Sequence, residues 1–371
     1  MMGVGPDRRA AIKLGSFAMP LHPPGSDFSQ TLADDLDQIV VADQLGLTEY
    51  WIGEHFTAEW ENIPAPDLLI AQALGVTKNI ILGTGVSCLP NHHPFVLAHR
   101  IAQLDHMAKG RLHWGVGTGG FAGDLEVFGY GPEGRDNRRM TQESIQAVLD
   151  IWDGADPGLY EGGFFSYTIP EPVENIGLRL HVKPYQQPHP PIGVAGVSDY
   201  SSTLKLAGRE GWIPMSTNLI PASHLKTHWA AVEEGATSAG KTTDRSIWRI
   251  AREIFVADTT EEALDEAING TIGRDFRDYF LQLLPDSPYF NLLKTHDDMP
   301  DADVTAEYMA ENVWIVGSPD EVEARLRKLY ADVGGFGVLL VMAHEWEPRD
   351  KWLHSIELLA RDVMPRLADL A

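Results

Sequence analysis

A glutamate and a histidine, Glu54 and His55, stand side by side directly after a short apolar segment of the sequence. Histidine has an ordinary pKa near 6.5, so it can donate or accept a proton at neutral pH. The pair could therefore carry out acid–base chemistry, or it could serve only to fix its loop by hydrogen bonding. A place at the end of a barrel strand would favour the chemical role, and His55 is our candidate catalytic residue.

A run of glycine and hydroxyl residues lies between an apolar segment and an amphipathic one further along the chain. Backbone N–H groups at the start of a helix, together with hydroxyls, can bind a phosphate without much positive charge. Serine is also preferred as an ordinary helix cap, so the pattern alone leaves both interpretations open. The candidate phosphate-binding residues of this run are Gly196, Val197, Ser198, Tyr200, Ser201 and Ser202.

Several histidines and arginines could support other chemistry. His92 and His93 lie near His99, His106 and His113 in the sequence, which raises the possibility of a metal site. Metal-dependent barrel hydrolases typically take a His-x-His pair from the end of the first strand, where this chain has Phe17-Ala18-Met19. A metal hydrolase is therefore a minor alternative, and we expect no metal.

A small basic cluster stands out in an otherwise acidic chain. Arg135, Arg138 and Arg139 lie close together beside the loop that follows the fourth expected strand. Arginine pairs well with phosphate, so Arg139 is a candidate cofactor-binding residue. Pairing with nearby carboxylates such as Glu143 explains the cluster equally well.

The composition excludes several classes of partner. The chain has 53 acidic and 29 basic residues and a net charge of −24, so we expect neither nucleic acid nor a membrane surface as a partner. Cys88 is the single cysteine, which excludes an intramolecular disulfide and fits a cytoplasmic protein. No apolar run is long enough to span a membrane, and residues 1–11 resemble a loose polar tail rather than a signal peptide.

The elements that must position these residues alternate between short apolar and longer amphipathic segments. About eight strand–helix units predict an α/β fold with a closed parallel (β/α)8 TIM barrel, and no Gly-x-Gly-x-x-Gly follows the first strand to suggest a dinucleotide fold. Strands are expected at 12–17, 49–52, 80–84, 112–117, 192–195, 212–215, 248–256 and 337–341, and helices at 31–45, 66–76, 94–107, 139–152, 201–210, 222–239, 321–332 and 350–367.

Two stretches break this rhythm. Residues 153–190 are rich in proline and glycine, with hairpin character around 160–169, and residues 259–311 look helical but irregular. We expect a single barrel domain over residues 1–371 that carries both stretches as insertions.

In such barrels the active site lies in the loops at the carboxyl ends of the strands. The loops of this chain are rich in aromatic, methionine and glycine residues, which suits a flat aromatic cofactor with apolar walls. The candidate substrate-pocket residues are Phe17, Phe56, Trp60, Phe121, Met215 and Trp346, and the remaining candidate cofactor-binding residues are Met19, Gly85, Val86, Asn91, Gly117, Thr118 and Gly119.

The motifs that carry these residues resemble those of the bacterial-luciferase-like flavin monooxygenases, and the order and spacing agree through most of the chain. The opening at 17–25 and the stretch through Trp60 look most like the limonene-type monooxygenases. The matching segments are Trp51–Phe56, Leu82–Val86, Leu89-Pro90 with His93-Pro94, Leu104–Arg111 and Val316–Val322.

The resemblance implies a two-component enzyme. Reduced FMN, supplied by a separate flavin reductase, would react with O₂ to give a C4a-peroxyflavin that oxygenates a small, largely apolar organic substrate. His55 matches the family's active-site histidine, and Gly85-Val86 matches its often cis, non-proline peptide. Residues 117–119 and 198–203 match the regions that hold the ribityl phosphate. Relatives of this kind commonly form homodimers or larger homo-oligomers.

Departures from luciferase itself bear on the activity. Luciferase carries a reactive cysteine and a phosphate-binding arginine where this chain has Gly117 and Thr118, and a second histidine where it has Phe56. Light emission is therefore not expected, and the grip on the phosphate must come from elsewhere. The same barrel also serves enzymes that transfer hydride with the deazaflavin F420, which is the nearest alternative. The net charge of −24 argues mildly against the acidic tail of F420.

Overall fold

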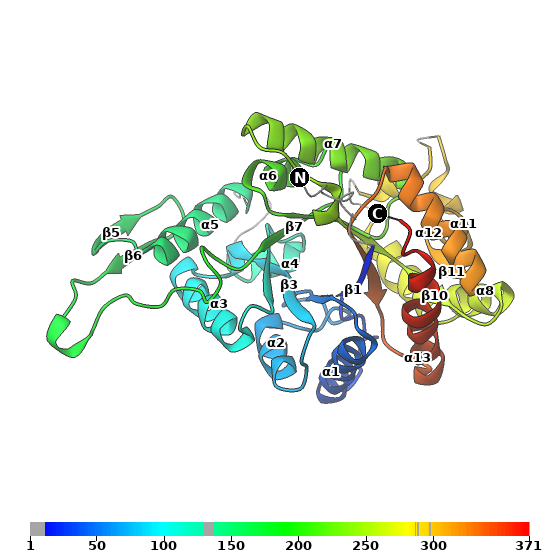
Figure 1. Cartoon of the computed structure of the whole chain (residues 1–371), viewed down its shortest axis with the longest axis horizontal. Helices are drawn as coiled ribbons and strands as arrows, with labels where there is room; N and C mark the ends of the chain where they lie inside the picture. Colours follow the sequence, from blue (N-terminus) through cyan, green and yellow to red (C-terminus); the bar gives the residue numbers. More distant parts are fainter. Residues whose placement is uncertain (1–11, 130–136, 286, 288, 297, 371) are drawn as a thin grey trace, which may run out of the picture.

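The computed structural model describes residues 12–129, 137–285, 287, 289–296 and 298–370, so the expected tail and Arg135 lie outside the described residues. Eight parallel strands form a closed barrel in the order β1-β12-β9-β8-β7-β4-β3-β2, as the sequence predicted (Figure 1). The strands are β1 (Lys13–Ala18), β2 (Glu49–Ile52), β3 (Ile81–Cys88), β4 (Leu112–Gly117), β7 (Ile192–Gly196), β8 (Ile213–Ser216), β9 (Arg249–Arg252) and β12 (Val338–Ala343).

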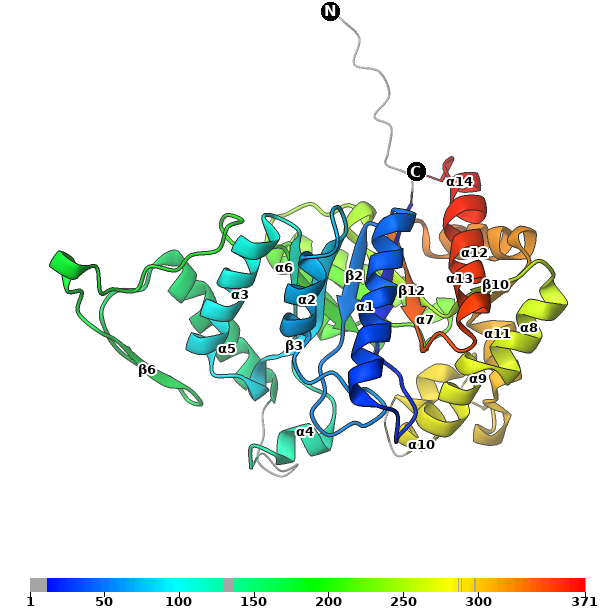
Figure 2. The same ribbon diagram turned by 90° about the horizontal axis from the view of Figure 1, so that it is seen from below.

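Helices follow the strands and cover the outside of the barrel (Figure 2). Their boundaries agree closely with the expected ones. The helices are α1 (Phe28–Leu45), α2 (Pro66–Leu74), α3 (Pro94–Ala108), α5 (Asn137–Asp153), α6 (Ser202–Glu210), α7 (Ala222–Ser238), α12 (Pro319–Val333) and α13 (Arg349–Leu358), which continues through π-helical Leu359–Val363 into α14 (Met364–Arg366).

Local signals set the ends of these helices. Helix α1 ends at Gly46, whose φ of 82° is left-handed and therefore favours glycine. Helix α12 begins with Pro319 after Ser318, whose hydroxyl accepts a hydrogen bond from the Glu321 N–H at 3.4 Å. Both signals are local features of the sequence, a glycine after one helix and a serine–proline pair before the other.

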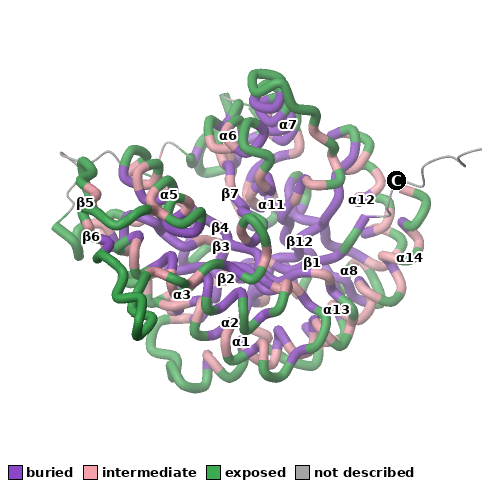
Figure 3. The backbone as a smooth tube through the Cα atoms, turned by 60° about the vertical axis from the view of Figure 1, so that its left-hand side comes forward, coloured by how far each residue is buried: buried purple, intermediate pink, exposed green. Residues whose placement is uncertain are grey.

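The barrel strands are largely buried (Figure 3), and buried side chains fill the interior of the barrel. The Trp51 indole lies at its centre, and a Cβ atom added to Gly83 or Gly193 would come within 2.6 Å and 2.9 Å of that ring. The indole N–H donates to Glu49 Oε1 at 2.8 Å, and Glu49 pairs with Arg249 at 2.9 Å. Because this part of the barrel is packed, a ligand must bind beyond the strand ends.

One expected strand was wrong. Residues 248–256 form two strands, because the chain leaves the barrel at Glu253, and the buried Glu253 carboxylate contacts His344 at 2.6 Å. The second strand, β10 (Ile254–Val256), pairs in parallel with β11 (Ile315–Gly317) in a separate two-stranded sheet. Strand β11 was not expected, and β3 extends four residues beyond the predicted end at Thr84.

The two stretches expected as insertions differ in form. Residues 153–190 include an antiparallel hairpin of β5 (Gly158–Glu161) and β6 (Ser166–Ile169), which projects from the body in Figures 1 and 2. Residues 259–311 include α8 (Thr260–Asn269), α9 (Thr271–Asp275), π-helical Phe276–Phe280, α10 (Leu281–Leu283) and α11 (Ala306–Asn312).

The second stretch has an apolar core of its own. Phe276, Tyr279 and Phe280 belong to this cluster, against which Trp60 and Phe121 of the strand-end loops also pack. The segment therefore covers the end of the barrel at which a ligand must bind.

Candidate active site

His55 follows β2 and lies between two carboxylates. Its Nδ1 is 3.1 Å from Asp124 Oδ2, and its Nε2 is 3.3 Å from Glu61 Oε2. The imidazole is 15% exposed, whereas both carboxylate side chains are buried. The ring is thus oriented by buried partners but still accessible.

Asp124 lies on the short helix α4 (Ala122–Glu126) and fixes the loop after β2. Its Oδ1 accepts hydrogen bonds from the Phe56 N–H at 3.1 Å, the Thr57 N–H at 2.8 Å and the Thr57 hydroxyl at 2.6 Å. Burial alone would raise the pKa of Asp124, but the hydrogen bonds with His55 and Thr57 lower it below its ordinary value. Asp124 is therefore a carboxylate at neutral pH.

The two carboxylates determine the charge of His55. Burial alone would lower the pKa of the imidazole, but the contacts with Asp124 and Glu61 more than offset this effect and raise the pKa to about 9. His55 is therefore an imidazolium at neutral pH, with a proton on each ring nitrogen.

The segment 259–311 contributes a residue to this cluster. The Tyr279 hydroxyl donates to Glu61 Oε1 at 2.6 Å, and its ring stacks on Trp60 with centroids 5.5 Å apart. Burial, and then the Glu61 charge, raise the pKa of Tyr279, so the hydroxyl stays protonated and remains a donor.

Two of the predicted pocket residues lie at the charged cluster around His55. The Phe121 ring lies 4.1 Å from the imidazole, and Trp60 stacks on Tyr279, whose hydroxyl donates to Glu61. Met19, predicted as a cofactor-binding residue, packs against the same apolar cluster as Trp60 and Phe121, and Phe17 contacts Gly85. Phe121 and Trp60 form an aromatic wall beside the charged cluster.

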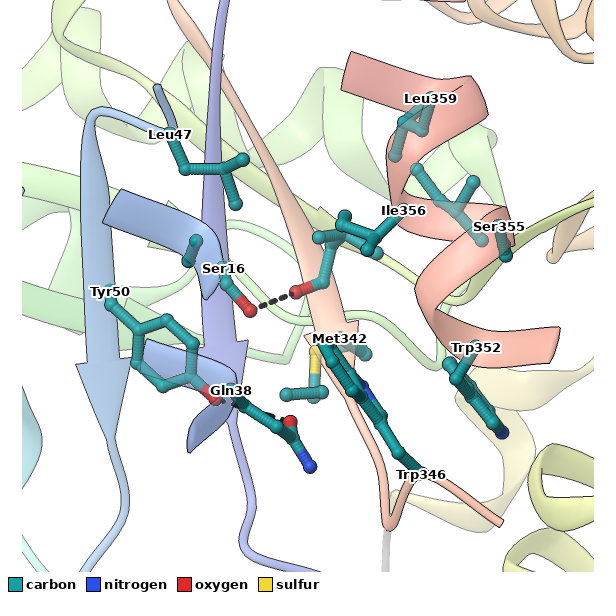
Figure 4. A pocket seen from close by; sticks show the side chains of 14 residues that line it. Ser16, Gln38, Leu47, Tyr50, Met342, Trp346, Trp352, Ser355, Ile356 and Leu359 are labelled. Atoms are coloured by element: carbon teal, nitrogen blue, oxygen red, sulfur yellow. Dashed lines mark hydrogen bonds between the residues drawn. The ribbon is translucent and has the colours of Figure 1, made fainter. Parts of the chain in front are cut away.

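The other predicted pocket residues lie apart. Phe56 is 38% exposed and meets Phe128, and Met215 is buried inside the barrel next to Gly193. Trp346 lies near Arg349 and lines a cavity of about 30 Å³ between β1, β12 and the helices α1 and α13 (Figure 4). A role for these three residues in substrate binding stays a prediction.

One of the predicted cofactor-binding residues near β3 and β4, Asn91, has a buried side-chain amide without a hydrogen-bond partner. The Gly85–Val86 peptide is cis, as the resemblance implies, and a side chain at Gly117 would clash with Val86. Asn91, at the end of the turn Leu89–Asn91, is buried, and neither polar atom of its amide has a hydrogen-bond partner. A ligand with both donors and acceptors on a flat edge, such as a flavin, would satisfy that amide.

The run at 196–202 forms the turn from β7 into α6. Ser201 is the N-cap residue of α6, and its hydroxyl accepts from the Leu204 N–H at 3.4 Å. Tyr200 has a left-handed φ of 46°, and the first N–H groups of α6 have no carbonyl within the helix. Ser198 and Ser202 are exposed beside them. This donor set fits a phosphate group.

Side chains of α7 hold this turn. The His228 Nε2 lies 3.3 Å from the Val197 carbonyl, the Thr227 hydroxyl accepts from the Tyr200 N–H at 3.1 Å, and His224 pairs with Asp199 at 2.8 Å. None of these α7 residues was predicted.

Three other predicted cofactor-binding residues have different surroundings. Arg139 lies over the Phe164 ring, 5.8 Å from its centroid. Gly119 has a left-handed φ of 70° and lies close to Cys88, and Thr118, the residue before it, is half-buried.

Three of the histidines considered as metal ligands have other partners. His92 Nε2 lies 2.8 Å from Glu54 Oε1, His99 bonds to the Phe95 carbonyl at 2.7 Å, and His106 bonds to the Lys183 carbonyl at 2.9 Å. Among the described residues, no three histidine, cysteine or acidic side chains are placed to hold a metal ion.

A second histidine lies between two carboxylates elsewhere at the strand ends. His344, directly after β12, has Nε2 2.6 Å from Glu253 and Nδ1 2.7 Å from Asp275. Its side chain is 1% exposed. Burial alone would lower its pKa, but the two carboxylates raise it to about 10.

The sequence did not reveal Glu61, Asp124, Tyr279 or the partners of His344. Glu61 and Asp124 are two acidic residues among 53 in the chain, and Tyr279 lies in an irregular segment with no motif. The one available signal was the position of Glu61 shortly after His55, directly behind the stretch through Trp60 that resembles known monooxygenases.

Comparison with known proteins agrees with the resemblance seen in the motifs. Residues 12–335 match the luciferase-like monooxygenase family. The chain is 36% identical to a 4-hydroxyprotoasukamycin monooxygenase of Streptomyces nodosus subsp. asukaensis, over 96% of this chain and 92% of that protein. It is 31% identical to the limonene 1,2-monooxygenase of Rhodococcus erythropolis, over 95% of this chain and 86% of that protein.

A solved structure extends the comparison to the fold. The oxygenating constituent of the 3,6-diketocamphane monooxygenase of Pseudomonas putida, a type II Baeyer–Villiger monooxygenase in complex with FMN, superimposes with a TM-score of 0.89. The two are 32% identical, and the match covers 96% of this chain and 98% of that one. In the part of the chain that the structure describes, no helix is both long and apolar enough to cross a membrane. By sequence and by fold, this chain belongs to the luciferase-like monooxygenase family.

Proposed function

We propose that this protein is the oxygenase component of a two-component FMN-dependent monooxygenase, which uses reduced FMN and O₂ to oxygenate a small, largely apolar organic substrate. The observation that carries the proposal is the match over nearly the whole chain to an oxygenating subunit that binds FMN. The unsatisfied Asn91 amide and the donors at the start of α6 support the same cofactor.

Two regions would hold the cofactor. The start of α6, with Ser198, Ser201 and Ser202, would bind the phosphate through N–H and hydroxyl donors. Asn91 would lie against the ring system, because its amide is buried without a partner. The glycines at 117 and 119 would let the ribityl phosphate chain approach the backbone closely. When bound, reduced FMN supplies the chemistry that activates oxygen.

The protein would contribute a dry wall and a fixed proton. Phe17, Phe121 and the Trp60–Tyr279 stack would exclude water from the reacting centre. His55, oriented through Nδ1 by Asp124, would hold a proton on Nε2 and stabilise negative charge that develops beside it.

The proposed partners follow from the cofactor. A separate flavin reductase would supply reduced FMN. Assembly into a homodimer or larger homo-oligomer, a cytoplasmic location and a single barrel domain with two insertions remain parts of the proposal. F420-dependent enzymes share the fold, but at 20% identity or less this likeness concerns the fold alone.

Anaerobic titration with reduced FMN, and separately with reduced F420, tests the cofactor, and rapid mixing with oxygenated buffer then tests the reaction. We expect tight binding of reduced FMN and oxygen uptake coupled to product when small apolar ketones or alkenes are added. Binding of F420 alone, with no reaction with oxygen, would overturn the proposal and make the protein a hydride-transfer enzyme.

A further inference from the structure

The contacts around His55 form a chain that runs from the segment 259–311 into the site. The Tyr279 hydroxyl donates to one oxygen of Glu61, and the other oxygen of Glu61 faces His55 Nε2. On the opposite edge of the ring, Asp124 binds Nδ1 and is itself held by two backbone N–H groups of the loop after β2. Each residue in this series of contacts holds the next one in place.

The two contacts of the imidazole are not equivalent. The Nδ1–Asp124 contact, at 3.1 Å, is a hydrogen bond, whereas Nε2 and Glu61, at 3.3 Å, form a looser ion pair. Nε2 is thus the nitrogen that a ligand can approach, and Glu61 supplies the charge that keeps it protonated. Phe121, against the ring, limits access of water.

We propose that Glu61, Asp124 and Tyr279 are positioning residues of the oxygenation site: the two carboxylates hold His55 as a cation, and Tyr279 fixes Glu61 in place. The proposal rests on the proposed function. Because Tyr279 belongs to the segment that covers the barrel, the charge of His55 depends on that segment being seated. A cation in an apolar pocket stabilises negative charge on a bound ligand more strongly than it would in water.

The other ionisable groups near His55 do not replace this pair. Glu54, at the end of β2, is engaged by His92 at 2.8 Å. Burial raises the pKa of the Cys88 thiol, on β3, well above its ordinary value, so that thiol is neutral. Glu61 and Asp124 are the acidic side chains that contact the imidazole among the described residues.

An NMR titration of the ligand-free protein tests the proposal without depending on turnover. The imidazole signal of His55 is assigned from its loss in His55→Gln and is followed from about pH 6 to about pH 10.5. We expect a midpoint near pH 9. Glu61→Gln and Asp124→Asn should each lower the midpoint by about 1–3 units, because each removes an opposite charge within contact distance. Asparagine can still accept the backbone hydrogen bonds of Asp124, so the loop should stay folded.

Tyr279→Phe tests whether the tyrosine acts through Glu61. This variant keeps the stack on Trp60 but frees Glu61 to move, so we expect the His55 midpoint to fall by less than in Glu61→Gln. Adding Tyr279→Phe to Glu61→Gln should cause no further decrease, because the carboxylate that it fixes is already absent. Tyr308→Phe is a matched control, because it removes a hydroxyl that donates to the Leu293 carbonyl in the same segment without contacting Glu61. In the complete enzyme with FMN and reductase, the fraction of consumed oxygen that appears in product should fall in Tyr279→Phe but not in Tyr308→Phe.

A wild-type midpoint near 6.5, or one that Glu61→Gln leaves unchanged, would overturn the proposal. The proposal would also be overturned if Tyr279→Phe changed the His55 midpoint equally in the wild-type protein and in Glu61→Gln. The expected titration in a protein that does not bind reduced FMN would instead count against the proposed function alone.

Discussion

Two histidines at the strand ends have the same kind of surroundings but different geometry. His55 lies 3.1 Å and 3.3 Å from its two carboxylates and is 15% exposed, whereas His344 lies 2.6 Å and 2.7 Å from its own and is 1% exposed. His344 has no room for a ligand, since both of its nitrogens form short hydrogen bonds in a buried site. Accessibility, rather than the residue types, separates the histidine proposed for chemistry from the one that is enclosed.

The residues around His344 connect the segment 259–311 to the barrel. Asp275 belongs to α9, and Glu253 stands where the chain leaves the barrel after β9. The Asn218 amide donates to Glu253 at 2.5 Å, and Arg274 joins Asp275 to Glu345. The network therefore fastens the segment 259–311 to the barrel, which in turn places Tyr279 beside Glu61.

Replacement of His55 tests the first half of this comparison and should have the largest effect. We expect His55→Ala to lower the rate of product formation by about 10²–10⁴-fold, the range for loss of a positioned acid–base group. Binding of reduced FMN, measured by anaerobic titration, should be retained, because the contacts of His55 are with Asp124, Glu61 and Phe121 rather than with the predicted phosphate site at α6. Normal turnover in this variant would contradict the role given to His55.

Removal of Asp275 tests the second half. Asp275→Ala leaves the buried charge of His344 and the half-buried charge of Arg274 without that partner, so we expect the free energy of unfolding to fall by about 3–5 kcal/mol in urea titrations. Asp278→Ala, at an exposed position three residues further on, is the control and should change stability by less than about 0.5 kcal/mol. Similar stability of the two variants would show that the His344 network does not fasten the segment.

The pH dependence of stability follows from the same network. The pKa of His344 is raised to about 10. Burial alone would lower the pKa of His22, but its contacts with Asp35 and Glu345 raise it to about 9. Because the pKa of each histidine is higher in the folded protein than its unfolded value of about 6.5, each protonated histidine contributes its full stabilisation below that pH and loses it as the pH rises. The free energy of unfolding should therefore decrease between about pH 6.5 and about pH 10. A flat profile over this range in urea titrations would exclude protonated histidines from the network.

The comparison also shows what could be predicted from the sequence. The barrel and the place of His55 follow from local patterns, because apolar periodicity and strand-end position are set by neighbouring residues. The partners of His55 do not, since Asp124 is 69 positions away and Tyr279 is 218 positions from Glu61. Residues 248–256 were expected as one strand because apolar residues on both sides of Glu253 hide the break between β9 and β10.

A pair of threonines offers the finest test of the difference between the two regions. The Thr57 hydroxyl donates to Asp124 at 2.6 Å beside His55, and the Thr271 hydroxyl donates to the Glu347 carbonyl at 2.7 Å on the His344 side. Replacing either by valine keeps the shape and removes one hydrogen bond, so each should cost about 0.5–1.5 kcal/mol of unfolding free energy.

Their effects on activity should nevertheless diverge. Thr57→Val loosens the carboxylate that orients His55, so it should lower the yield of product per oxygen consumed, whereas Thr271→Val should leave that yield unchanged at temperatures where both variants are folded. Equal losses of yield would mean that stability of the segment, rather than orientation of the imidazole, limits the reaction. A loss confined to Thr57→Val would assign chemistry to one of the two otherwise similar histidine clusters.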